Sequence, residues 1–563
     1  MFEEEIKRLN PKPKFNLTWY RNEDRYSDGA VENDIIHIIA ENKPEDYSEA
    51  IHENFSWPAY YYLINLRKNI LNWYPFQENA DILEIGCGLG AVTDMLCDRG
   101  RSVTAVELSK RRATAALLRC RERENLEIIV GNLNDIKFEK KFDYITLIGV
   151  LEYQGHYTES EHPYTDFLSN IRRLLKPNGK LLIAIENKYG LKYWCGASED
   201  HTGVPFDGLN QYRIGNKNAC TFSKAELTEV IEKSGFEYHY FYYPLPDYKL
   251  PVVIYSEDYL PTEGNVEYFS PYYIPNTDGL VIDEMGVYDD LIKNNVFEFF
   301  ANSFLVECGN EKEKRTYPVF ASLSSERERE YRIGTVIDSE KKVSKFVTEA
   351  SAEADHIKQI GKNLEYLKKH GLDIVPYSIE NGVMIMDYQA SETLETIVLR
   401  AYKNRNIDEI VRIYDRLWNE IEKSSDIVGE EHNILRDAGK GQNYGKILAY
   451  GNLDMILKNC FVSGEKGENW KWFDQEWGIS GVPAAFIFFR AVTALYVWNR
   501  WLGEVLPIRD VFVKYGIAGW VNDFMELNEC FIAQVVDWKG YECSLRIRSV
   551  PDGVYVNNIS KLV

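Results

Sequence analysis

The sequence predicts an α/β fold in which an open, mostly parallel sheet carries helices on both faces and is followed by a second, α+β unit. Between residues 78 and 255, short apolar runs alternate with charged, amphipathic segments, as in parallel sheets that are covered on both sides. From about residue 310, the pattern changes to strand-like runs followed by a mostly helical region. The length of 563 residues also favours several structural units over one.

We expect five regions along the chain. Residues 1–75 form an N-terminal helical cap, because apolar side chains recur there at helical spacing. Residues 76–255 form the sheet, and residues 256–305, which are rich in Tyr, Pro, Asp and Asn, connect it to the second unit. The second unit covers residues 306–505, and residues 506–563 form a C-terminal helical extension.

Five apolar runs in the sheet region are expected to be buried strands, and the charged segments between them are expected to be helices. In chain order the strands are 81–86 (DILEIG), 102–108 (SVTAVEL), 126–131 (LEIIVG), 142–150 (FDYITLIGV) and 179–186 (GKLLIAIE). In the second unit, the runs VSKFVTEA and VMIMDY are expected to be strands on either side of a helix at about 350–370. The apolar stretch Pro483–Trp501 carries Arg490 at its centre. Because such a charge is costly in lipid, we expect a buried helix and no transmembrane segment.

The composition excludes several classes of protein. Hydrophobic residues make up 45% and charged residues 27% of the chain, as in folded proteins that are neither disordered nor fibrous. The 65 Lys and Arg residues stand against 87 Asp and Glu, so the net charge is −22 and nucleic acid is not an expected partner. The nine cysteines are scattered, and the N-terminus is acidic and polar. These features predict a cytoplasmic protein without disulfides or a signal peptide.

The most informative motif is a glycine-rich turn after the first expected strand, within ILEIGCGLGAVTDML. Gly86, Gly88 and Gly90 allow a left-handed backbone and a close approach of the main chain to a ligand at the start of a helix. Glu84 stands two residues before the first glycine. The next strand ends in Glu107, whose carboxylate can accept both hydroxyls of a ribose. The sequence therefore predicts a site for a nucleoside-containing ligand.

The spacing E-x-G-x-G-x-G differs from the G-x-G-x-x-G of dinucleotide sites. It resembles motif I of the class I S-adenosylmethionine-dependent methyltransferases, which have a Rossmann-like sheet. The resemblance implies that Glu84 and the three glycines belong to the cofactor site, with the glycines along the methionine part and Glu107 on the ribose. Asn132 takes the place of an Asp that contacts the adenine, and Gly149 follows the fourth strand. A phosphate-binding or unliganded α/β sheet is the alternative.

Two further resemblances concern the acceptor. The segment from ILEIG to IIVGN superficially resembles the rRNA adenine dimethyltransferases, but this chain has GVLEY where those enzymes grip a flipped adenine with an Asn-Leu-Pro-Tyr-type motif. Residues 185–203 and 244–251 resemble segments of bacterial methyltransferases found with cell-surface polysaccharide assembly. This resemblance implies a glycan or sugar-phosphate acceptor, and glycosyltransferases of the assembly as partners.

Residues 185–203 leave the carboxyl end of the last expected strand, where ligands of open α/β sheets bind. Methyl transfer to oxygen needs a base, or an acceptor that is already ionised. We expect His201, backed by Glu199 or Asp200, to accept the proton of the acceptor. The alternative is that these polar residues only cap the loop and fix its turn.

The second unit carries residues that suit phosphoryl transfer. Lys345 lies in a strand-like run before a helix that holds Glu353, and kinases grip the α- and β-phosphates with such a pair. Asp454 and Asn459 have the spacing of a catalytic base and a magnesium ligand. Asp474 stands where a second magnesium-binding acid is expected.

The order of these residues resembles the aminoglycoside-phosphotransferase and choline-kinase-like fold over about residues 310–505, which implies Mg-ATP as a ligand. Asn452 replaces the histidine that precedes the catalytic Asp in that family, and no glycine-rich loop precedes Lys345. We therefore expect a kinase-like unit that either phosphorylates the acceptor or binds it as an inactive fold.

Three accounts of function are compatible with these motifs. In the first, an S-adenosylmethionine-dependent enzyme O-methylates a sugar, glycan or sugar phosphate in cell-surface polysaccharide biosynthesis. In the second, the chain is a non-catalytic scaffold or regulator of polysaccharide assembly that binds the same cofactor. In the third, it is a small-molecule kinase. The complete glycine turn, together with Glu84 and Glu107, favours the enzyme.

Overall fold

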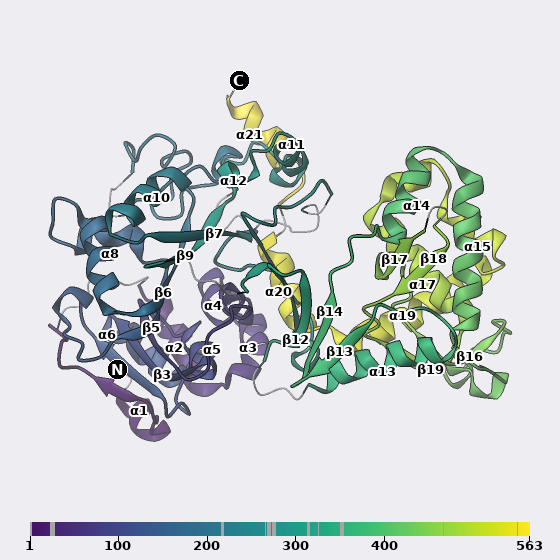
Figure 1. Cartoon of the computed structure of the whole chain (residues 1–563), viewed down its shortest axis with the longest axis horizontal. Helices are drawn as coiled ribbons and strands as arrows, with labels where there is room; N and C mark the ends of the chain where they lie inside the picture. Colours follow the sequence, from purple (N-terminus) through teal and green to yellow (C-terminus); the bar gives the residue numbers. More distant parts are fainter. Residues whose placement is uncertain are drawn as a thin grey trace. The chain divides into compact units, whose positions relative to one another are not determined.

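The computed structural model of the chain is shown in Figure 1. It describes residues 3–22, 29–215, 219–264, 266, 272, 277–311, 316–324, 326–349, 354–464, 467–548 and 550–562. The chain divides into two compact units, one made of Met1–Glu326 with Asp537–Val563 and the other of Arg327–Val536. The first unit contains the predicted parallel sheet, and the second contains the strands and helices of residues 327–536.

The first unit is built on one sheet with the strand order β1-β4-β3-β2-β5-β6-β9-β7-β8-β10. Neighbouring strands from β1 to β6 run parallel, whereas β9 lies antiparallel between β6 and β7. The strands are β1 Lys14–Asn16, β2 Ala80–Ile85, β3 Gly100–Glu107, β4 Leu126–Val130, β5 Phe142–Ile148, β6 Leu175–Glu186, β7 Tyr238–Leu245, β8 Val253–Ser256, β9 Ser303–Gly309 and β10 Pro318–Leu323. The five predicted strands are β2 to β6, and the predicted Rossmann-like parallel sheet is confirmed.

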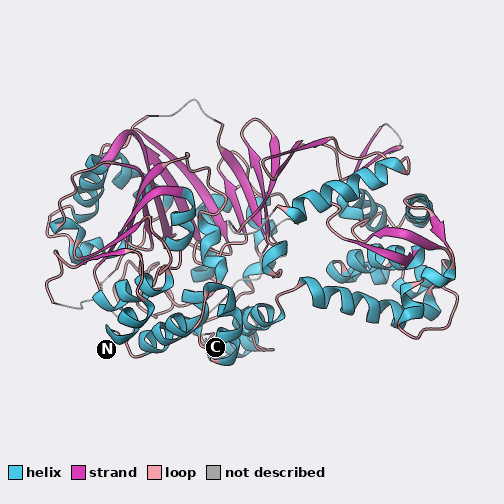
Figure 2. Ribbon diagram, turned by 90° about the horizontal axis from the view of Figure 1, so that it is seen from below, coloured by secondary structure: helices cyan, strands magenta, loops and turns pink. Residues whose placement is uncertain are grey.

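Helices cover this sheet, and Figure 2 shows the strands of the unit flanked by them. The helices near the sheet are α5 Thr93–Arg99, α6 Lys110–Arg119, α8 Pro163–Leu174 and α10 Lys224–Lys233. The apolar faces of α8 and α10 bury Phe167, Ile171, Leu227 and Ile231 in the same core as the strand residues of β5 and β6. The amphipathic segments between the predicted strands therefore cover the sheet, as their sequence pattern indicates.

The N-terminal segment is largely helical. It contains α1 Glu3–Leu9, α2 Val31–Glu41, α3 Tyr47–Glu53, α4 Trp57–Leu63 and the 3₁₀ turn η2 Asn65–Ile70. The apolar side chains that recur through this region are buried, namely Tyr60, Leu63, Leu66, Ile70 and Trp73. The cap also provides β1, which pairs in parallel with β4 at one edge of the sheet.

The boundaries of the two units differ from those expected at residues 255, 305 and 505. All residues of β9 are buried, because the strand lies inside the first sheet. β9 crosses the boundary expected at residue 305, so the start of the region expected to be the second unit belongs to the first sheet. Helix α20 (Trp538–Arg548) belongs to the first unit too, where Cys543 and Ile547 are buried with the cap helices. These contacts join segments that are distant in sequence, and local periodicity does not reveal such contacts.

The second unit begins with an antiparallel sheet in the order β11-β12-β14-β13, against which α13 packs. These elements are β11 Ile333–Asp338, β12 Lys342–Val347, α13 Asp355–Lys369, β13 Tyr377–Glu380 and β14 Val383–Asp387. The expected order of strand, helix and strand is therefore present. A helical part with short strands follows, including α14 Leu394–Lys403, α15 Ile407–Lys423, β16 Ile447–Asn452, β17 Cys460–Ser463, β18 Asn469–Trp472, β19 Gly478–Pro483, α17 Ala484–Trp498, α18 Ile508–Lys514 and α19 Val521–Val535.

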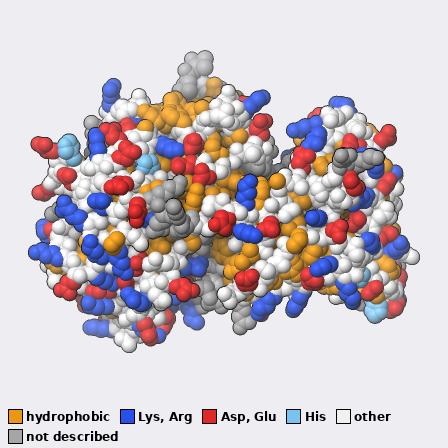
Figure 3. Space-filling view, in the orientation of Figure 1, with side chains coloured by type: hydrophobic (Ala, Val, Ile, Leu, Met, Phe, Trp, Pro, Cys, Tyr) orange, Lys and Arg blue, Asp and Glu red, His pale blue; other side chains and the backbone are white. Residues whose placement is uncertain are grey.

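Helix α17 forms from the apolar stretch that approaches the length of a membrane span. Most of its side chains are buried in the core of the second unit, and Nε of Arg490 donates a hydrogen bond of 3.2 Å to the carbonyl oxygen of Leu453. Within the described parts of the chain, no helix combines the length and the apolar character that crossing a membrane requires. On the face drawn in Figure 3, acidic and basic side chains are interspersed.

Candidate functional site

A cavity of about 500 Å³ opens in the first unit. Its lining comes from the segments that follow β2, β3, β4, β5 and β6, and from the cap helix α4. Ligands of open α/β sheets bind at this carboxyl edge of the strands, and the volume lies in the range of small-molecule sites.

The glycine-rich turn forms one wall of this cavity. Gly86, Gly88 and Gly90 have positive φ angles of 76°, 54° and 77°. Gly86 and Gly88 line the cavity, and a Cβ on Gly86 would lie 2.4 Å from Cγ2 of Val150. Gly90 lies outside the lining, and a Cβ there would lie 3.0 Å from Cα of Ala116 in α6. The first two glycines therefore shape the cavity, whereas Gly90 permits close packing of the turn against α6.

Glu107 ends β3 and lines the cavity beside Gly88. Its Oε2 accepts a hydrogen bond of 2.8 Å from the backbone N–H of Gly88, and its Oε1 accepts one of 3.0 Å from the N–H of Ser109. A carboxylate can accept about four hydrogen bonds, so Glu107 retains capacity for two ligand hydroxyls. The open backbone of Gly88 next to this carboxylate fits a cofactor that contains a ribose.

Glu84 has a different place from the one expected. It is buried in β2 and lies outside the cavity lining. Burial raises the pKa of Glu84 to about 7. The acid before the glycine turn is therefore an internal group of the sheet, and it does not face the cavity.

Asn132 and Gly149 line the cavity beyond the ends of β4 and β5. The side-chain oxygen of Asn132 accepts a hydrogen bond of 3.0 Å from the backbone N–H of Asn134 and so begins a short 3₁₀ turn. Gly149 has a φ of 67°, and a Cβ there would lie 2.8 Å from the hydroxyl oxygen of Tyr248. Asn132 and Gly149 therefore line the same cavity as the glycine turn.

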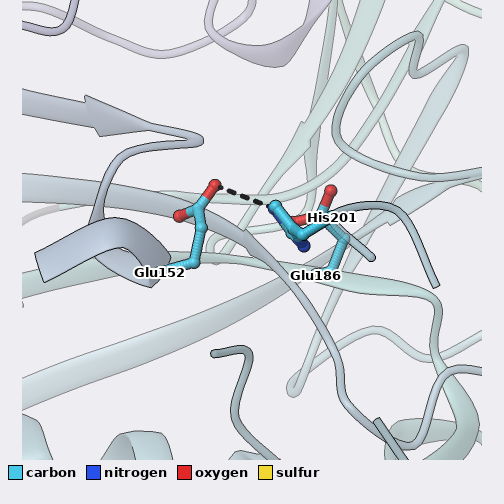
Figure 4. Close-up of side chains that lie close together, drawn as sticks. All are labelled: Glu152, Glu186 and His201. Atoms are coloured by element: carbon cyan, nitrogen blue, oxygen red, sulfur yellow. Dashed lines mark ion pairs between the residues drawn. The ribbon is translucent and has the colours of Figure 1, made fainter. Parts of the chain in front are cut away.

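His201 lines the same cavity. Its Nδ1 is 2.9 Å from Oε1 of Glu199, and its Nε2 is 3.6 Å from Oε1 of Glu152. Burial alone would lower the pKa of His201, but the neighbouring carboxylates of Glu152, Glu199 and Glu186 raise it well above its usual value. Figure 4 shows the side chains of Glu152, Glu186 and His201 close together. Of the two acids expected to back His201, Glu199 does so.

Asp200 lines the cavity but pairs with lysines. Its Oδ2 is 2.7 Å from Nζ of Lys192, and its Oδ1 is 3.1 Å from Nζ of Lys249. Burial would raise the pKa of Asp200, but the two lysines lower it far below its usual value. Asp200 therefore stays ionised in a network that also contains the buried Asp247, 3.1 Å from Lys192.

Several residues around His201 were given no role by the sequence analysis. Glu152 and Glu186 follow or end predicted strands, and this position was the signal that could have singled them out. Lys249 belongs to the segment PLPDYKLP and forms an ion pair with Glu186. The cap contributes aromatic side chains to the lining, namely Trp57, Tyr61 and Tyr62.

In the second unit, four of the five expected residues lie close to one another. Lys345 in β12 forms an ion pair with Asp474. Nδ2 of Asn459 donates hydrogen bonds of 3.2 Å to the backbone carbonyl oxygens of Asp454 and Asp474. Burial and the charge of Glu476 raise the pKa of Asp454 to about 7. The structure therefore brings a lysine, an asparagine and two aspartates of the predicted set together.

The expected partner of Lys345, the helix carboxylate Glu353, cannot be compared with the described contacts of the lysine. Glu353 lies outside the described residues, and Glu349 is 3.5 Å from Arg332. Besides Asp474, Lys345 is 3.5 Å from Oε1 of Glu476, which follows β18. The two acids that hold the lysine therefore come from the segment after the β17–β18 hairpin.

Comparison with known proteins gives the class of the first unit. A family model described as a methyltransferase domain matches residues 83–183. An uncharacterized methyltransferase of Staphylococcus carnosus is 36% identical over 114 residues, which is 20% of this chain and 51% of the relative. A ubiquinone biosynthesis O-methyltransferase of Pelagibacter ubique is 30% identical over 112 residues, or 20% of this chain and 44% of the relative. A probable S-adenosylmethionine-dependent methyltransferase of Mycolicibacterium smegmatis is 28% identical over 158 residues, or 28% of this chain and 52% of the relative.

The chain spans about half the length of these curated relatives. The matched family region runs from β2 into β6 and therefore includes the glycine turn and Glu107. Together, the sheet, the turn and these matches define a class I S-adenosylmethionine-dependent methyltransferase domain. S-adenosylmethionine is the cofactor that this fold supports.

Proposed function

We propose that the chain is an S-adenosylmethionine-dependent O-methyltransferase that acts on a hydroxyl group of a sugar, glycan or sugar phosphate in cell-surface polysaccharide biosynthesis. When bound, S-adenosylmethionine supplies an electrophilic methyl group on a positively charged sulfur. The observation that carries the proposal is that one cavity holds both the glycine turn with Glu107 and the polar cluster around His201. A donor and an acceptor bound in this cavity are brought together, which is the main requirement of group transfer.

Several residues are proposed to bind the cofactor. The free acceptor positions of Glu107 suit the ribose hydroxyls, and Gly86 and Gly88 allow the main chain to lie against the methionine part. Asn132 suits the adenine, because it lines the cavity beyond β4. Gly149 lines the cavity beside Tyr248 and Glu152, so we assign it to the part of the cofactor site that borders the acceptor. Glu84 and Gly90 lie outside the lining, so we assign them to the support of the turn.

The acceptor end of the cavity suits a ligand with many hydroxyl groups. Trp57, Tyr61 and Tyr248 offer flat apolar surface and, on tyrosine, a hydroxyl. Asp200 and Lys249 offer hydrogen-bond acceptors and donors on the same lining. A sugar ring presents apolar faces and polar edges, so it matches both kinds of surface.

His201 marks the place where we expect the acceptor hydroxyl to lose its proton. Methylation of an alcohol requires that this proton leave, and the ring of His201 is held in place by Glu199. The carboxylates of Glu152 and Glu199 favour a proton on the ring. A protonated ring cannot accept the proton of the acceptor. His201 can therefore act as a base only after it has lost its own proton, which a second cation near the carboxylates would favour.

The test is to incubate the full chain with labelled S-adenosylmethionine and a nucleic-acid-depleted bacterial lysate, and to follow the label into lipid-linked glycan, soluble metabolite and protein fractions. We expect label in the glycan or sugar-phosphate fraction. His201→Ala is expected to retain cofactor binding by calorimetry and to lower turnover by about a hundredfold or more. Label in protein alone would refute the glycan acceptor, and unchanged turnover of the variant would remove His201 from the mechanism.

The second unit is proposed to be kinase-like and to phosphorylate or hold the acceptor, with Mg-ATP as its ligand. The pairing of Lys345 with Asp474, and the contacts of Asn459 with the segments of Asp454 and Asp474, support this assignment. A sugar phosphate would be a chemically reasonable product to pass to the methyltransferase. The competing candidate is a scaffold of polysaccharide assembly that recruits glycosyltransferases. One observation favours it: Asp474 and Glu476 already pair with Lys345, so this lysine is not free to bind phosphates.

A further inference from the structure

We infer that Glu152, Glu186 and His201 form a site for one divalent metal ion at the acceptor end of the cavity. Each residue offers one ligand atom, and these atoms lie within 4.8 Å of one another. Ligand atoms around a bound ion are about 3 to 4 Å apart, given bonds of about 2.1 Å, so small side-chain rotations would close the site. Figure 4 shows the three side chains in this cluster. Only the use of the ion in methyl transfer rests on the proposed function.

The three proposed ligands come from three different segments of the chain, which the fold brings together. Glu152 lies in the 3₁₀ turn Leu151–Tyr153 directly after β5, and Glu186 is the last residue of β6. The two strands are parallel neighbours, so their carboxyl ends bring both acids to one edge of the sheet. His201 comes from the loop that follows α9 (Leu191–Trp194) and lines the same cavity.

The hydrogen bonding of His201 suits a metal ligand. Nδ1 lies 2.9 Å from Oε1 of Glu199, which favours the tautomer with the proton on Nδ1 and a lone pair on Nε2. Oε2 of Glu199 accepts hydrogen bonds of 2.7 Å from the backbone N–H groups of His201 and Thr202, so this acid is itself held. A carboxylate that orients a histidine in this way is the usual outer neighbour of metal-binding histidines.

The two glutamates each have a buried oxygen that lacks a hydrogen-bond partner. Glu152 and Glu186 are 1% and 0% exposed, and Oε2 of each accepts no hydrogen bond in the described structure. Lys249 contacts Oε1 of Glu186 and so leaves Oε2 of that residue unpaired. A buried carboxylate oxygen without a partner is costly. A cation between the two acids would satisfy both oxygens.

The acidic and basic side chains around the proposed site are compatible with a bound cation. Lys192 and Lys249 pair with Asp200, Asp247 and Glu186. Glu152 and Glu199 have only His201 as a cationic neighbour among these contacts. In these contacts five carboxylates stand against three basic side chains, and a divalent ion would reduce this excess.

The ligand set indicates which ions fit. Two carboxylates and one imidazole suit Mn²⁺ or Zn²⁺, whereas Mg²⁺ and Ca²⁺ prefer oxygen ligands alone. Three protein ligands leave coordination positions open for the hydroxyl oxygens of an acceptor. A cation at that position lowers the pKa of the hydroxyl, so the acceptor oxygen becomes nucleophilic without a general base.

The reaction then balances as follows. The acceptor oxygen forms the new bond to the methyl carbon with its own electron pair, and its proton passes to water. The carbon–sulfur bond breaks with its electron pair remaining on sulfur, which leaves a neutral thioether. The ion replaces His201 as the group that prepares the hydroxyl, and His201 becomes one of its ligands.

The inference is tested by titrating the chelator-treated full chain with Mn²⁺, with binding followed by electron paramagnetic resonance, and with Zn²⁺ by calorimetry. We expect one ion per chain, and a loss of affinity of about tenfold or more in Glu152→Gln, Glu186→Gln and His201→Ala. Glu159→Gln, at an exposed position on the same segment, is the matched control and should bind as the wild type does. S-adenosylmethionine binding by each variant reports whether it has folded.

The outcomes separate the two proposals. Absence of Mn²⁺ and Zn²⁺ binding at millimolar concentrations, or equal binding by a folded Glu152→Gln variant, overturns the metal site. Full methyl transfer to a glycan after removal of metal overturns it as well but leaves the proposed function intact. Metal binding that depends on these three residues supports the site even if no hydroxyl acceptor is found.

Discussion

The backbone N–H of Gly88 donates a hydrogen bond of 2.8 Å to Oε2 of Glu107, so the glycine turn after β2 is tied to the acid that ends β3. The other oxygen of Glu107 accepts from the N–H of Ser109, the N-cap residue of α6. One carboxylate therefore connects both loops on this side of the cavity, in addition to its proposed contact with the ribose.

Substitution of Glu107 should separate these two roles. Gln retains an oxygen that can accept from Gly88, so Glu107→Gln should keep the turn and lose the charge-assisted bonds to the ribose. We expect S-adenosylmethionine affinity to fall by about ten- to a hundredfold, which corresponds to about 1.5–3 kcal/mol. Glu107→Ala should lose more affinity and also lower the melting temperature. Calorimetry and thermal unfolding of both variants measure the difference, and equal binding by Glu107→Gln would remove Glu107 from the cofactor site.

Gly90→Ala should affect the fold more than the site. A Cβ at this position would lie 3.0 Å from the Cα of Ala116, and φ is positive, so the substitution adds both crowding and backbone strain. We expect a loss of stability of about 1–3 kcal/mol, seen as a lower melting temperature. Cofactor binding at low temperature should remain close to that of the wild type, because Gly90 is outside the cavity lining. A stable variant that no longer binds cofactor would contradict this assignment.

The buried Glu84 makes stability depend on pH in a defined direction. Its folded-state pKa is about 7, above the value of 4.5 expected in the unfolded chain. Between these values the folded chain keeps the proton and the unfolded chain releases it, so the contribution to stability falls as pH rises from 4.5 to 7 and is constant above 7. The size of this effect is about 3 kcal/mol as an order of magnitude.

Glu84→Gln removes this titration while keeping the shape of the side chain. We expect the melting temperature of the variant, relative to that of the wild type, to be higher at pH 8 than at pH 5. Taking the difference between the two proteins cancels the titration of other groups, and Glu159→Gln provides an exposed control. A difference that does not change with pH would show that Glu84 is ionised in the folded protein at pH 5.

Features that depend on neighbouring residues in the sequence could be predicted, whereas features that depend on contacts between distant residues could not. The strands β2 to β6 and the positions of Gly88 and Glu107 were predicted, because apolar runs and motif spacing are local features. The sequence did not predict that Glu199, and not Asp200, is the partner of His201. This pairing depends on Lys192 and Lys249, which form ion pairs with Asp200.

Long-range contacts were equally hidden in the sequence. β9 lies far along the chain from the strand beside it, β6, and no local pattern indicates that it belongs to the first sheet. The same holds for α20, which returns to the cap from the end of the chain. In the second unit, spacing singled out Lys345 and Asp474, whereas the contact of Lys345 with Glu476 needs the three-dimensional arrangement.

Binding of Mg-ATP by the full chain decides whether the second unit has kinase-like chemistry. Lys345 now pairs with Asp474, and a bound nucleotide would offer phosphates to the lysine and a metal ion to the acid. We expect calorimetry to detect Mg-ATP binding by the wild type, with a loss of about tenfold or more in Lys345→Met and Asp474→Asn.

Lys403→Met is the matched control for the lysine, because Lys403 is exposed on α14. S-adenosylmethionine affinity should be the same in all these variants, since Lys345 and Asp474 belong to the second unit and the glycine turn to the first. If the wild type binds no Mg-ATP, the pair of Lys345 and Asp474 is a closed structural ion pair, and the scaffold account of this unit is favoured. If Mg-ATP binds but Asp474→Asn binds it equally well, the nucleotide site lies elsewhere and the kinase-like assignment of Asp474 is wrong.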